Sequence, residues 1–345
     1  MARNNRQWLL GRRPSGVVKP EDFEYREGPA PERALAPGEI LVQNMVFLCA
    51  PTMRNWMDGP SKSLYPSIPL GQPVMAPAAA RVLASAEPRF PVGSRVATIG
   101  TWQDFEILDT AKLPARLLPD GASFIEGMGR YGLNSLTGYF GVIEVGRPQS
   151  GETLVVSAAA GSTGSVAAQV GRIKGCRVIG IAGGPDKCRW LRETCRLDAT
   201  IDYKHEDVGT RMAALCPNGI NIYFDNVGGD ILQAAIDNMA PFGRIVLCGQ
   251  IASYNDGRPA EGPRNMMRLV YGSITMQGFL NRNYSDQFPQ AIADLKTWVE
   301  SGELVAREDV REGFRELPQT YRALFDGSNQ GTLLAQIDAG ATAKS

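Results

Sequence analysis

The stretch LVVSAAAGSTGSVAAQVGRIKG, residues 154–175, decides the fold of the central part of this 345-residue chain. An apolar run leads through a loop of small residues into a segment with helical periodicity. The apolar residues of that segment are Val166, Ala167, Val170 and Ile173. This order of strand, loop and helix is typical of the turn that cradles dinucleotide phosphates, whose usual fingerprint is G-x-G-x-x-G. Here the six positions read AAGSTG, so the first glycine is missing.

The residues that are present can still form the phosphate-binding turn that the fingerprint describes. Gly161 lets the backbone reach a pyrophosphate, and Gly164 lets the helix approach the sheet. Ala159 can replace the first glycine if its φ stays negative. Phosphates would lie at the positive end of the helix, where Ser162 and Thr163 can add hydroxyl donors. The alternative is a Gly/Ala turn that binds no ligand.

Short β-branched runs alternate with helical patterns on both sides of this loop. They are LVVS (154–157), RVIGIA (177–182), ATIDY (199–203), INIYFDN (220–226), RIVLCG (244–249) and ITMQGF (274–279). Runs at this spacing predict βαβ units and therefore an α/β fold with a doubly wound parallel sheet. In that setting the glycine loop predicts a dinucleotide site.

The two ends of the chain differ from this central part. The first part contains proline-rich strand patterns: EILVQNMVFLCA (39–50), PAAARVLAS (77–85) and SRVATIGTWQDFEIL (94–108). No long amphipathic helix is predicted before Asp120. The last stretch, 303–345, has strand and turn character, and GTLLAQI (331–337) predicts a closing strand that packs back on the first domain.

The tip of the second central strand indicates which dinucleotide binds. An NAD site places an acid there to hold the ribose 2′-hydroxyl, and that acid would repel a 2′-phosphate. Here the tip reads Ala182, Gly183, Gly184, and Lys187 and Arg189 follow in the next turn. The sequence therefore favours NADP(H), although Lys187 could also be an ordinary surface lysine.

Composition excludes several classes of partner. Basic and acidic residues balance at 36 each, with 43% hydrophobic and 21% charged residues, as in a globular protein without affinity for nucleic acid or anionic membranes. The basic N-terminus carries only WLL as an apolar run, which is too short for a signal peptide, and no stretch reaches transmembrane length. We expect a cytoplasmic protein.

Metal binding is not predicted. The six cysteines, at positions 49, 176, 188, 195, 216 and 248, form no C-x-x-C pair, and His205 is the one histidine. Because a Cys/His zinc site needs clustered ligands, we expect no zinc and interpret the cysteines as small buried residues in a reducing compartment. His205 is expected at the surface.

Several of these stretches together resemble a known family. They are LTGYFGVIEVG (136–146), residues 151–187, FDNVGGDIL (224–232), GRIVLCGQIASYN (243–255), MQGFL (276–280) and NQGTLLAQI (329–337). The chain resembles the zinc-independent medium-chain dehydrogenase/reductases, and within them the NADPH-dependent alkenal/one (double-bond) reductases. The resemblance implies a GroES-like substrate domain from 1–126 and 303–345, a Rossmann NADPH domain at 127–302, and a homodimer.

The resemblance also assigns cofactor residues. Lys187 and Tyr203 would hold the 2′-phosphate, and Gly183 and Asn226 would line the adenosine and ribose. The residues that would follow the cofactor toward the nicotinamide are Cys248, Tyr254, Phe279, Leu280, Asn281 and Asn329, with Thr137 near the carboxamide.

The substrate-facing positions depart from the family pattern. The usual Asp-Pro-Tyr-Met-Arg is replaced by APTMR (50–54), which loses a tyrosine, and FLNRNY (279–284) is more polar than the common FIVFDY. The cofactor positions match while these positions do not. The pattern therefore supports the reaction class more strongly than any particular substrate.

Reduction of a C=C bond conjugated to a carbonyl needs one hydroxyl that stabilises the enolate. Tyr254, beyond the fifth strand, is the first candidate, and Tyr65 is the second; either could simply pack in the cleft. Trp56 and Trp102 could shape an apolar pocket or belong to the core. We expect an NADPH-dependent reductase of small enals and enones, with a quinone oxidoreductase or a non-catalytic NADPH-binding protein as alternatives.

Overall fold

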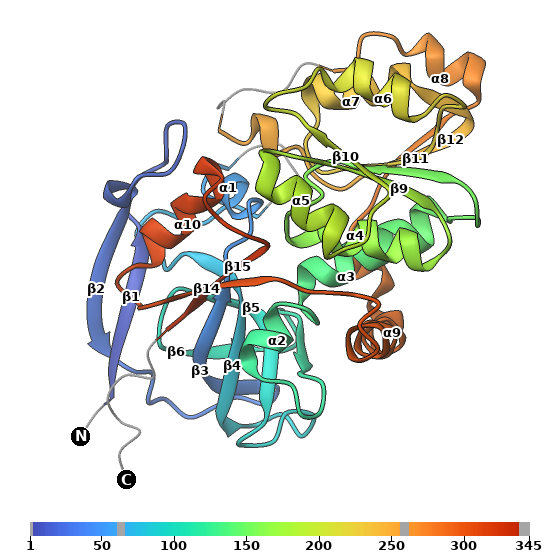
Figure 1. The fold of residues 1–345 in the computed structure, drawn as a ribbon. Helices are drawn as coiled ribbons and strands as arrows, with labels where there is room; N and C mark the ends of the chain where they lie inside the picture. Colours follow the sequence, from blue (N-terminus) through green and yellow to red (C-terminus); the bar gives the residue numbers. More distant parts are fainter. Residues whose placement is uncertain (1–2, 61–65, 256–261, 338–345) are drawn as a thin grey trace. The chain divides into compact units, whose positions relative to one another are not determined.

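The structure, a computed structural model, describes residues 3–60, 66–255 and 262–337. Contacts divide the chain into two compact units (Figure 1). Met1–Gly132 and Glu308–Ser345 form one, here the β-rich unit, and Leu133–Arg307 form the other, here the parallel-sheet unit.

The β-rich unit contains a two-stranded antiparallel sheet, β1-β2, and a seven-stranded sheet in the order β14-β15-β3-β4-β5-β7, with β6 paired to β3. Its strands are β1 (Asn4–Leu10), β2 (Phe23–Pro29), β3 (Glu39–Leu48), β4 (Met75–Ser85), β5 (Arg95–Thr101), β6 (Phe105–Asp109), β7 (Ala115–Leu117), β14 (Glu308–Glu312) and β15 (Thr332–Gln336). Alternate residues of β3, such as Ile40 and Val42, are buried, as expected for a strand with one face on a core. The predicted closing strand is confirmed, because β15 pairs with β3.

The helices of this unit are α1 (Met53–Trp56), α2 (Phe124–Met128) and α10 (Leu317–Asp326). The prediction of strand and turn character after residue 303 is confirmed for β14 and β15, but it misses α10, which lies between them. Its start and stop signals are present in the sequence: Pro318 lies in the first turn and Gly327 ends the helix with φ of 75°. Leu317, Tyr321 and Ala323 are buried, so the helix is held by its packing.

The parallel-sheet unit is built on six strands in the order β10-β9-β8-β11-β12-β13. They are β8 (Thr153–Val156), β9 (Arg177–Ala182), β10 (Ala199–Asp202), β11 (Ile220–Asp225), β12 (Met239–Leu247) and β13 (Thr275–Gly278). Every neighbouring pair is parallel, and each strand overlaps one of the predicted runs. The predicted doubly wound sheet is therefore confirmed.

Helices cover both faces of this sheet. They are α3 (Leu133–Phe140), α4 (Ser162–Ile173), α5 (Pro185–Glu193), α6 (Val208–Leu215), α7 (Gly229–Asp237), α8 (Met267–Gly272) and α9 (Phe288–Glu300). Figure 1 shows α4 and α5 on one face and α6, α7 and α8 on the other. Helix α3 continues into a π-helical turn, Gly141–Gly146. No helix in the described part of the chain has the length and apolar character needed to span a bilayer.

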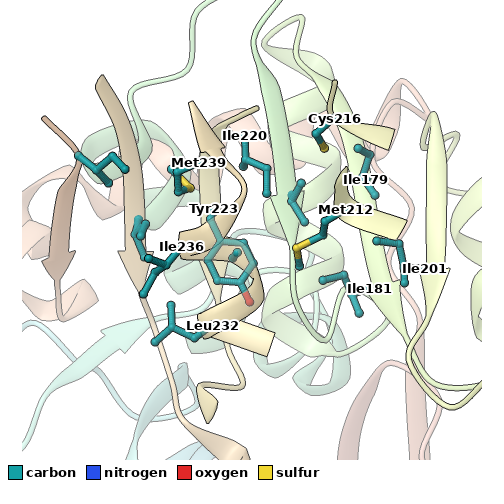
Figure 2. Packing of buried hydrophobic residues seen from close by; sticks show 14 residues of the cluster. Ile179, Ile181, Ile201, Met212, Cys216, Ile220, Tyr223, Leu232, Ile236 and Met239 are labelled. Carbon is teal, nitrogen blue, oxygen red and sulfur yellow. The ribbon is translucent and has the colours of Figure 1, made fainter. Parts of the chain in front are cut away.

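A hydrophobic cluster fills the space between the sheet and α6 and α7 (Figure 2). Strand residues such as Ile179, Ile201 and Tyr223 meet Met212 of α6 and Ile236 of α7, and all of them are fully buried. Strands buried on both faces need continuous apolar runs, which explains the β-branched sequence pattern. Burial of each such side chain stabilises the fold by about 1.5–3 kcal/mol. The loops at the strand ends therefore extend from a rigidly packed sheet.

Candidate active site

The strand order reverses direction between β8 and β11, which are neighbours in the middle of the parallel sheet. Connections from the carboxyl ends of these two strands diverge, and this opens a crevice of the kind that binds ligands in α/β sheets. Ser157 follows β8 and Asn226 follows β11. The Asn226 backbone N–H donates to Ser157 Oγ (2.8 Å), and Asn226 Nδ2 donates to the Ser157 carbonyl (2.7 Å). Asn226, a predicted cofactor residue, thus lies at this crevice.

The loop between β8 and α4 forms its tight turn without the first glycine of the G-x-G-x-x-G fingerprint. The positive φ of the turn lies at Ala158 (48°), and Ala159 keeps a negative φ, as the prediction required. Ala159 is fully buried, and Gly180 of β9 makes room for it. Gly164 has no such freedom, because a Cβ there would lie 2.3 Å from the Ala158 carbonyl oxygen. The third glycine is therefore required by close packing of backbone on backbone.

The N-terminus of α4 suits an anion. Its N-cap residue is Gly161, with φ of −84° and ψ of 174°, and this glycine has no side chain that could cap the helix. The first-turn amides, at Ser162 and Thr163, therefore present their positive ends at the crevice. Ser162 Oγ accepts a hydrogen bond from Asn134 Nδ2 (3.0 Å) at the start of α3. These residues fit the diphosphate of a dinucleotide.

The residues predicted for the adenosine end lie near the carboxyl ends of β9 and β10. A Cβ added to Gly183 would lie 2.8 Å from Tyr203 Cε1, so the tyrosine ring lies against that glycine. Tyr203 is 49% exposed, which leaves much of its ring accessible. Lys187 is half-buried in the first turn of α5, a helix whose N-cap, Gly184, also has no side-chain cap. A 2′-phosphate would find a cation and an uncapped helix here.

Asp202 is a residue of this end that the sequence reasoning missed. It ends β10, and its carboxylate accepts from the N–H groups of Gly184 (2.8 Å) and Lys204 (3.1 Å) and hydrogen-bonds His205 Nδ1 (2.8 Å). Desolvation raises its pKa, but these hydrogen bonds outweigh that effect and hold the pKa below its usual range. The Asp202 carboxylate is thus occupied by partners in its own loop and in the loop after β9. His205 is exposed, as predicted.

Asp225, at the end of β11, is a second residue that the sequence reasoning missed. Its carboxylate accepts from the Val227 N–H (3.2 Å), the Gly228 N–H (3.1 Å), the Tyr223 hydroxyl (3.1 Å) and the Ser157 hydroxyl (3.2 Å). Only 1% of the residue is exposed, and burial raises its pKa although the hydrogen bonds oppose the shift. This carboxylate shapes the loop after β11. The sequence feature that could have identified Asp225 is a polar residue at the end of an apolar strand.

The backbone carbonyl of Asp225 holds the next loop. It accepts from the N–H groups of Cys248 (2.9 Å) and Gly249 (3.0 Å), just beyond β12. Tyr254 follows a 3₁₀ turn, η3 (Ile251–Ser253), and its Oη accepts from the Gln250 N–H (3.1 Å). Burial raises the pKa of Cys248 to about 12, so its thiol stays neutral. Tyr254 therefore brings a half-buried phenol to the carboxyl edge of the sheet.

The segment after β13 is joined directly to α3. Asn281 Nδ2 donates to Thr137 Oγ1 (2.9 Å) and to the Leu133 carbonyl (3.1 Å), so two predicted cofactor residues, 144 positions apart, are hydrogen-bonded. Phe279 lies against the π-helical turn that follows α3, where a Cβ on Gly141 would be 2.7 Å from its Cζ. Leu280 is 53% exposed.

Two other residues singled out in the sequence lie outside the parallel-sheet unit, and Tyr65 falls outside the described residues. Asn329 belongs to the β-rich unit, where its Nδ2 donates to the Gly331 carbonyl (3.1 Å). Trp102 is fully buried between the rings of Phe23 and Tyr321 and is therefore core rather than pocket wall.

Across residues 3–60, 66–255 and 262–337, no group of three or more His, Cys, Asp or Glu side chains could hold a metal ion. Burial raises the pKa of several cysteine thiols, to about 12 for Cys49 and Cys195. These thiols are neutral, buried groups.

Comparison with known proteins covers both units. Residues 6–115 match the family described as N-terminal domain of oxidoreductase, and residues 162–297 match the family described as zinc-binding dehydrogenase. The chain is 33% identical to NADPH-dependent curcumin reductase of Escherichia coli, over 96% of this chain and 97% of that protein. It is 31% identical to the NADP(+)-dependent 2-alkenal reductase of Nicotiana tabacum, over 97% and 98%. The crystal structure of CurA with NADPH from Vibrio vulnificus superposes with a TM-score of 0.88 at 33% identity, covering 96% of this chain and 99% of that one.

Proposed function

Because this chain belongs to the zinc-independent medium-chain dehydrogenase/reductases, in their branch of NADPH-dependent double-bond reductases, we propose that it reduces the C=C bond of α,β-unsaturated aldehydes or ketones. The observation that carries the proposal is the uncapped N-terminus of α4 at the reversal point of the sheet, in a chain that aligns end to end with an alkenal reductase.

Different residues of the parallel-sheet unit bind different parts of the cofactor. The amides of Ser162 and Thr163 hold the diphosphate, Lys187 and Tyr203 hold the 2′-phosphate, and Asn226 and Thr137 lie toward the other half. NADPH, when bound, supplies a hydride to the β-carbon of the substrate. The protein must then stabilise negative charge on the carbonyl oxygen and deliver a proton to the α-carbon.

Tyr254 is the proposed source of that stabilisation. Its oxygen accepts from the Gln250 N–H, an arrangement that orients the phenol and favours donation of its proton to another acceptor. An enolate oxygen is such an acceptor, and the bond strengthens as charge develops. Tyr65 remains the second proposed donor, and Asn329 a further proposed cofactor contact.

The first test is consumption of NADPH with a simple enone and, separately, with a benzoquinone. We expect oxidation with the enone and a saturated ketone as product. Oxidation with the quinone alone would support a quinone oxidoreductase instead. NADPH binding without turnover of either would support the non-catalytic alternative. Elemental analysis of the same protein should find far less than one zinc per chain.

We also propose that the chain forms a homodimer through the edge of the parallel sheet. Strand β13 ends the sheet, so one side of its backbone is open to pairing. Six large apolar side chains near it are exposed: Phe242, Met266, Met267, Val270, Tyr271 and Leu280. Light scattering should give twice the 37.3 kDa of one chain, and replacing Val270 and Tyr271 by Asp should give monomers. The cytoplasmic location remains a prediction from the sequence.

A further inference from the structure

Five of the six cysteines of the chain are withdrawn from solvent, with at most 6% of each residue exposed: Cys49, Cys176, Cys188, Cys195 and Cys216. Burial raises the pKa of all five thiols, to about 11 for Cys176 and to about 12 for Cys49 and Cys195. At pH 7 a thiol with a pKa of about 12 is ionised in on the order of one molecule in 10⁵, against about one in 30 for a free cysteine. Because the thiolate and not the thiol is the nucleophile, these cysteines are unreactive.

The sixth cysteine, Cys248, is less deeply buried than the others and belongs to the candidate active site. Its backbone N–H donates to the Asp225 carbonyl (2.9 Å), which places it directly after β12. Burial of the thiol and, as a smaller effect, the negative charge of Asp225 raise the pKa of Cys248 to about 12. The cysteine of the site is therefore held in its neutral form as well.

The rest of the chain is also poor in nucleophilic side chains. Its 36 basic residues are 28 arginines and eight lysines, and His205 is the one histidine. A guanidinium stays protonated in proteins and does not attack carbon, whereas amines and imidazoles can. The His205 side chain is 67% exposed, but its Nδ1 is already hydrogen-bonded to the Asp202 carboxylate (2.8 Å). Buried cysteines are common in proteins, but here they are combined with few amines and a single imidazole.

This combination matters because the proposed substrates are electrophiles. In a Michael addition, a thiolate sulfur forms a bond to the β-carbon, and the electron pair of the C=C bond moves toward the carbonyl oxygen to give an enolate. The α-carbon then takes up a proton, and no group leaves. The β-carbon is also the atom that the hydride attacks, so a site that binds an enone raises the local concentration of the electrophile at its own side chains. A reactive thiol in such a site would alkylate the enzyme.

We propose that this protein is insulated against alkylation by α,β-unsaturated carbonyl compounds, because its thiols are buried, that of Cys248 included, and its positive charge is carried mainly by arginine. The inference rests on the proposed function, which supplies the electrophile. For a thiol with a pKa of about 12, the ionised fraction at pH 7 is about 3,000-fold lower than for a free cysteine. The greater nucleophilicity of the more basic thiolate offsets about 40-fold of this. Alkylation should therefore be slower by about 100-fold.

The test is incubation of the intact protein with acrolein at pH 7 in the absence of NADPH, followed by intact-mass spectrometry and peptide mapping. Ala213→Cys supplies the reference thiol, because Ala213 is an exposed residue of α6. We expect the introduced cysteine to be alkylated about 100-fold faster than any of the six native ones. The protein unfolded in guanidinium chloride should be alkylated at all six, because the protection comes from the fold.

Alkylation of Cys248 or of any other native cysteine within about tenfold of the rate of the introduced one would overturn the inference. Modification of His205 or of a lysine before the introduced cysteine would overturn it too. If Ala213→Cys does not fold, free glutathione in the same mixture serves as the reference thiol. Since no NADPH is present, the result does not depend on turnover. A protein that resists acrolein but does not oxidise NADPH with an enone would overturn the proposed function and leave the insulation standing.

Discussion

The phosphate loop and the nicotinamide side of the candidate site are built by different means. In the phosphate loop, the backbone itself makes the site, since Gly164 is forced by the Ala158 carbonyl and Gly161 leaves the helix end open. Beyond β11, β12 and β13, side chains hold the backbone in place, through Asp225, Tyr254 and Asn281.

This difference explains which positions match the family and which do not. A backbone site tolerates only residues that keep one local geometry, so its sequence is restricted. A site held by side chains can replace apolar residues by residues that form hydrogen bonds, as FLNRNY does for FIVFDY. Substitutions that disturb the backbone of the phosphate loop should therefore abolish cofactor binding, whereas substitutions on the nicotinamide side should reduce activity by graded amounts.

The largest effect is expected from Gly164→Ala. Its Cβ would lie 2.3 Å from a backbone oxygen that cannot move without shifting α4 from the sheet. We expect a loss of about 1–3 kcal/mol of stability and no detectable NADPH binding. Thermal melting and fluorescence titration measure the two effects. Gly161→Ala is the control: its Cβ would lie 3.2 Å from the same oxygen, so it should fold normally and weaken only NADPH binding. Equal damage by both changes would contradict the assignment of packing to one glycine and ligand approach to the other.

Tyr254→Phe tests the nicotinamide side. The phenylalanine keeps the ring and removes the hydroxyl, so kcat and kcat/KM should fall together by about 10²–10³-fold. A smaller fall is expected if Tyr65 shares the role. NADPH affinity should be nearly unchanged, and this also checks that losing the partner of the Gln250 N–H leaves the loop in place. An unchanged kcat would remove Tyr254 from the mechanism.

Lys187→Ala tests the adenosine end. Loss of a charge-assisted bond to the 2′-phosphate should weaken NADPH binding by about 1.5–3 kcal/mol and leave NADH binding almost unchanged. Arg189→Ala is a matched control, because Arg189 is exposed and already pairs with Asp186 (3.1 Å). Equal losses for NADPH and NADH would show that Lys187 supports the fold instead.

Asp225→Asn should give the smallest effect, and one that depends on pH. The raised pKa of Asp225 means that its contribution to stability is full below the unfolded value of about 3.9 and is lost as pH rises through the folded value. Asn keeps one acceptor oxygen but turns an N–H toward the Gly228 amide, at a cost of about 1–3 kcal/mol. The stability difference between wild type and variant, from denaturant unfolding, should shrink with rising pH. A difference that grows with pH would contradict the raised pKa.

Much of the parallel-sheet unit could be predicted because its signals are local. Each strand is a short β-branched run, and the phosphate loop combines small residues with a helical repeat. The sequence reasoning failed at α10, where an apolar face of widely spaced residues was interpreted as strand and turn, although Pro318 and Gly327 marked the helix ends. It also missed Asp202, because an acid on the third strand has no place in the usual fingerprint.

The sequence by itself determined the strand runs, the small-residue loop and the acid-free end of β9, since all of these depend on neighbouring residues and on backbone sterics. Only the tertiary structure decided that the strained residue of the loop is Ala158, that Asp225 binds Ser157 and Gly228, and that Asn281 meets Thr137. Those contacts join residues up to 144 positions apart, and their geometry follows from how helices and strands pack. A hydrogen bond needs its two atoms within about 3 Å, a precision that periodicity along the chain does not carry.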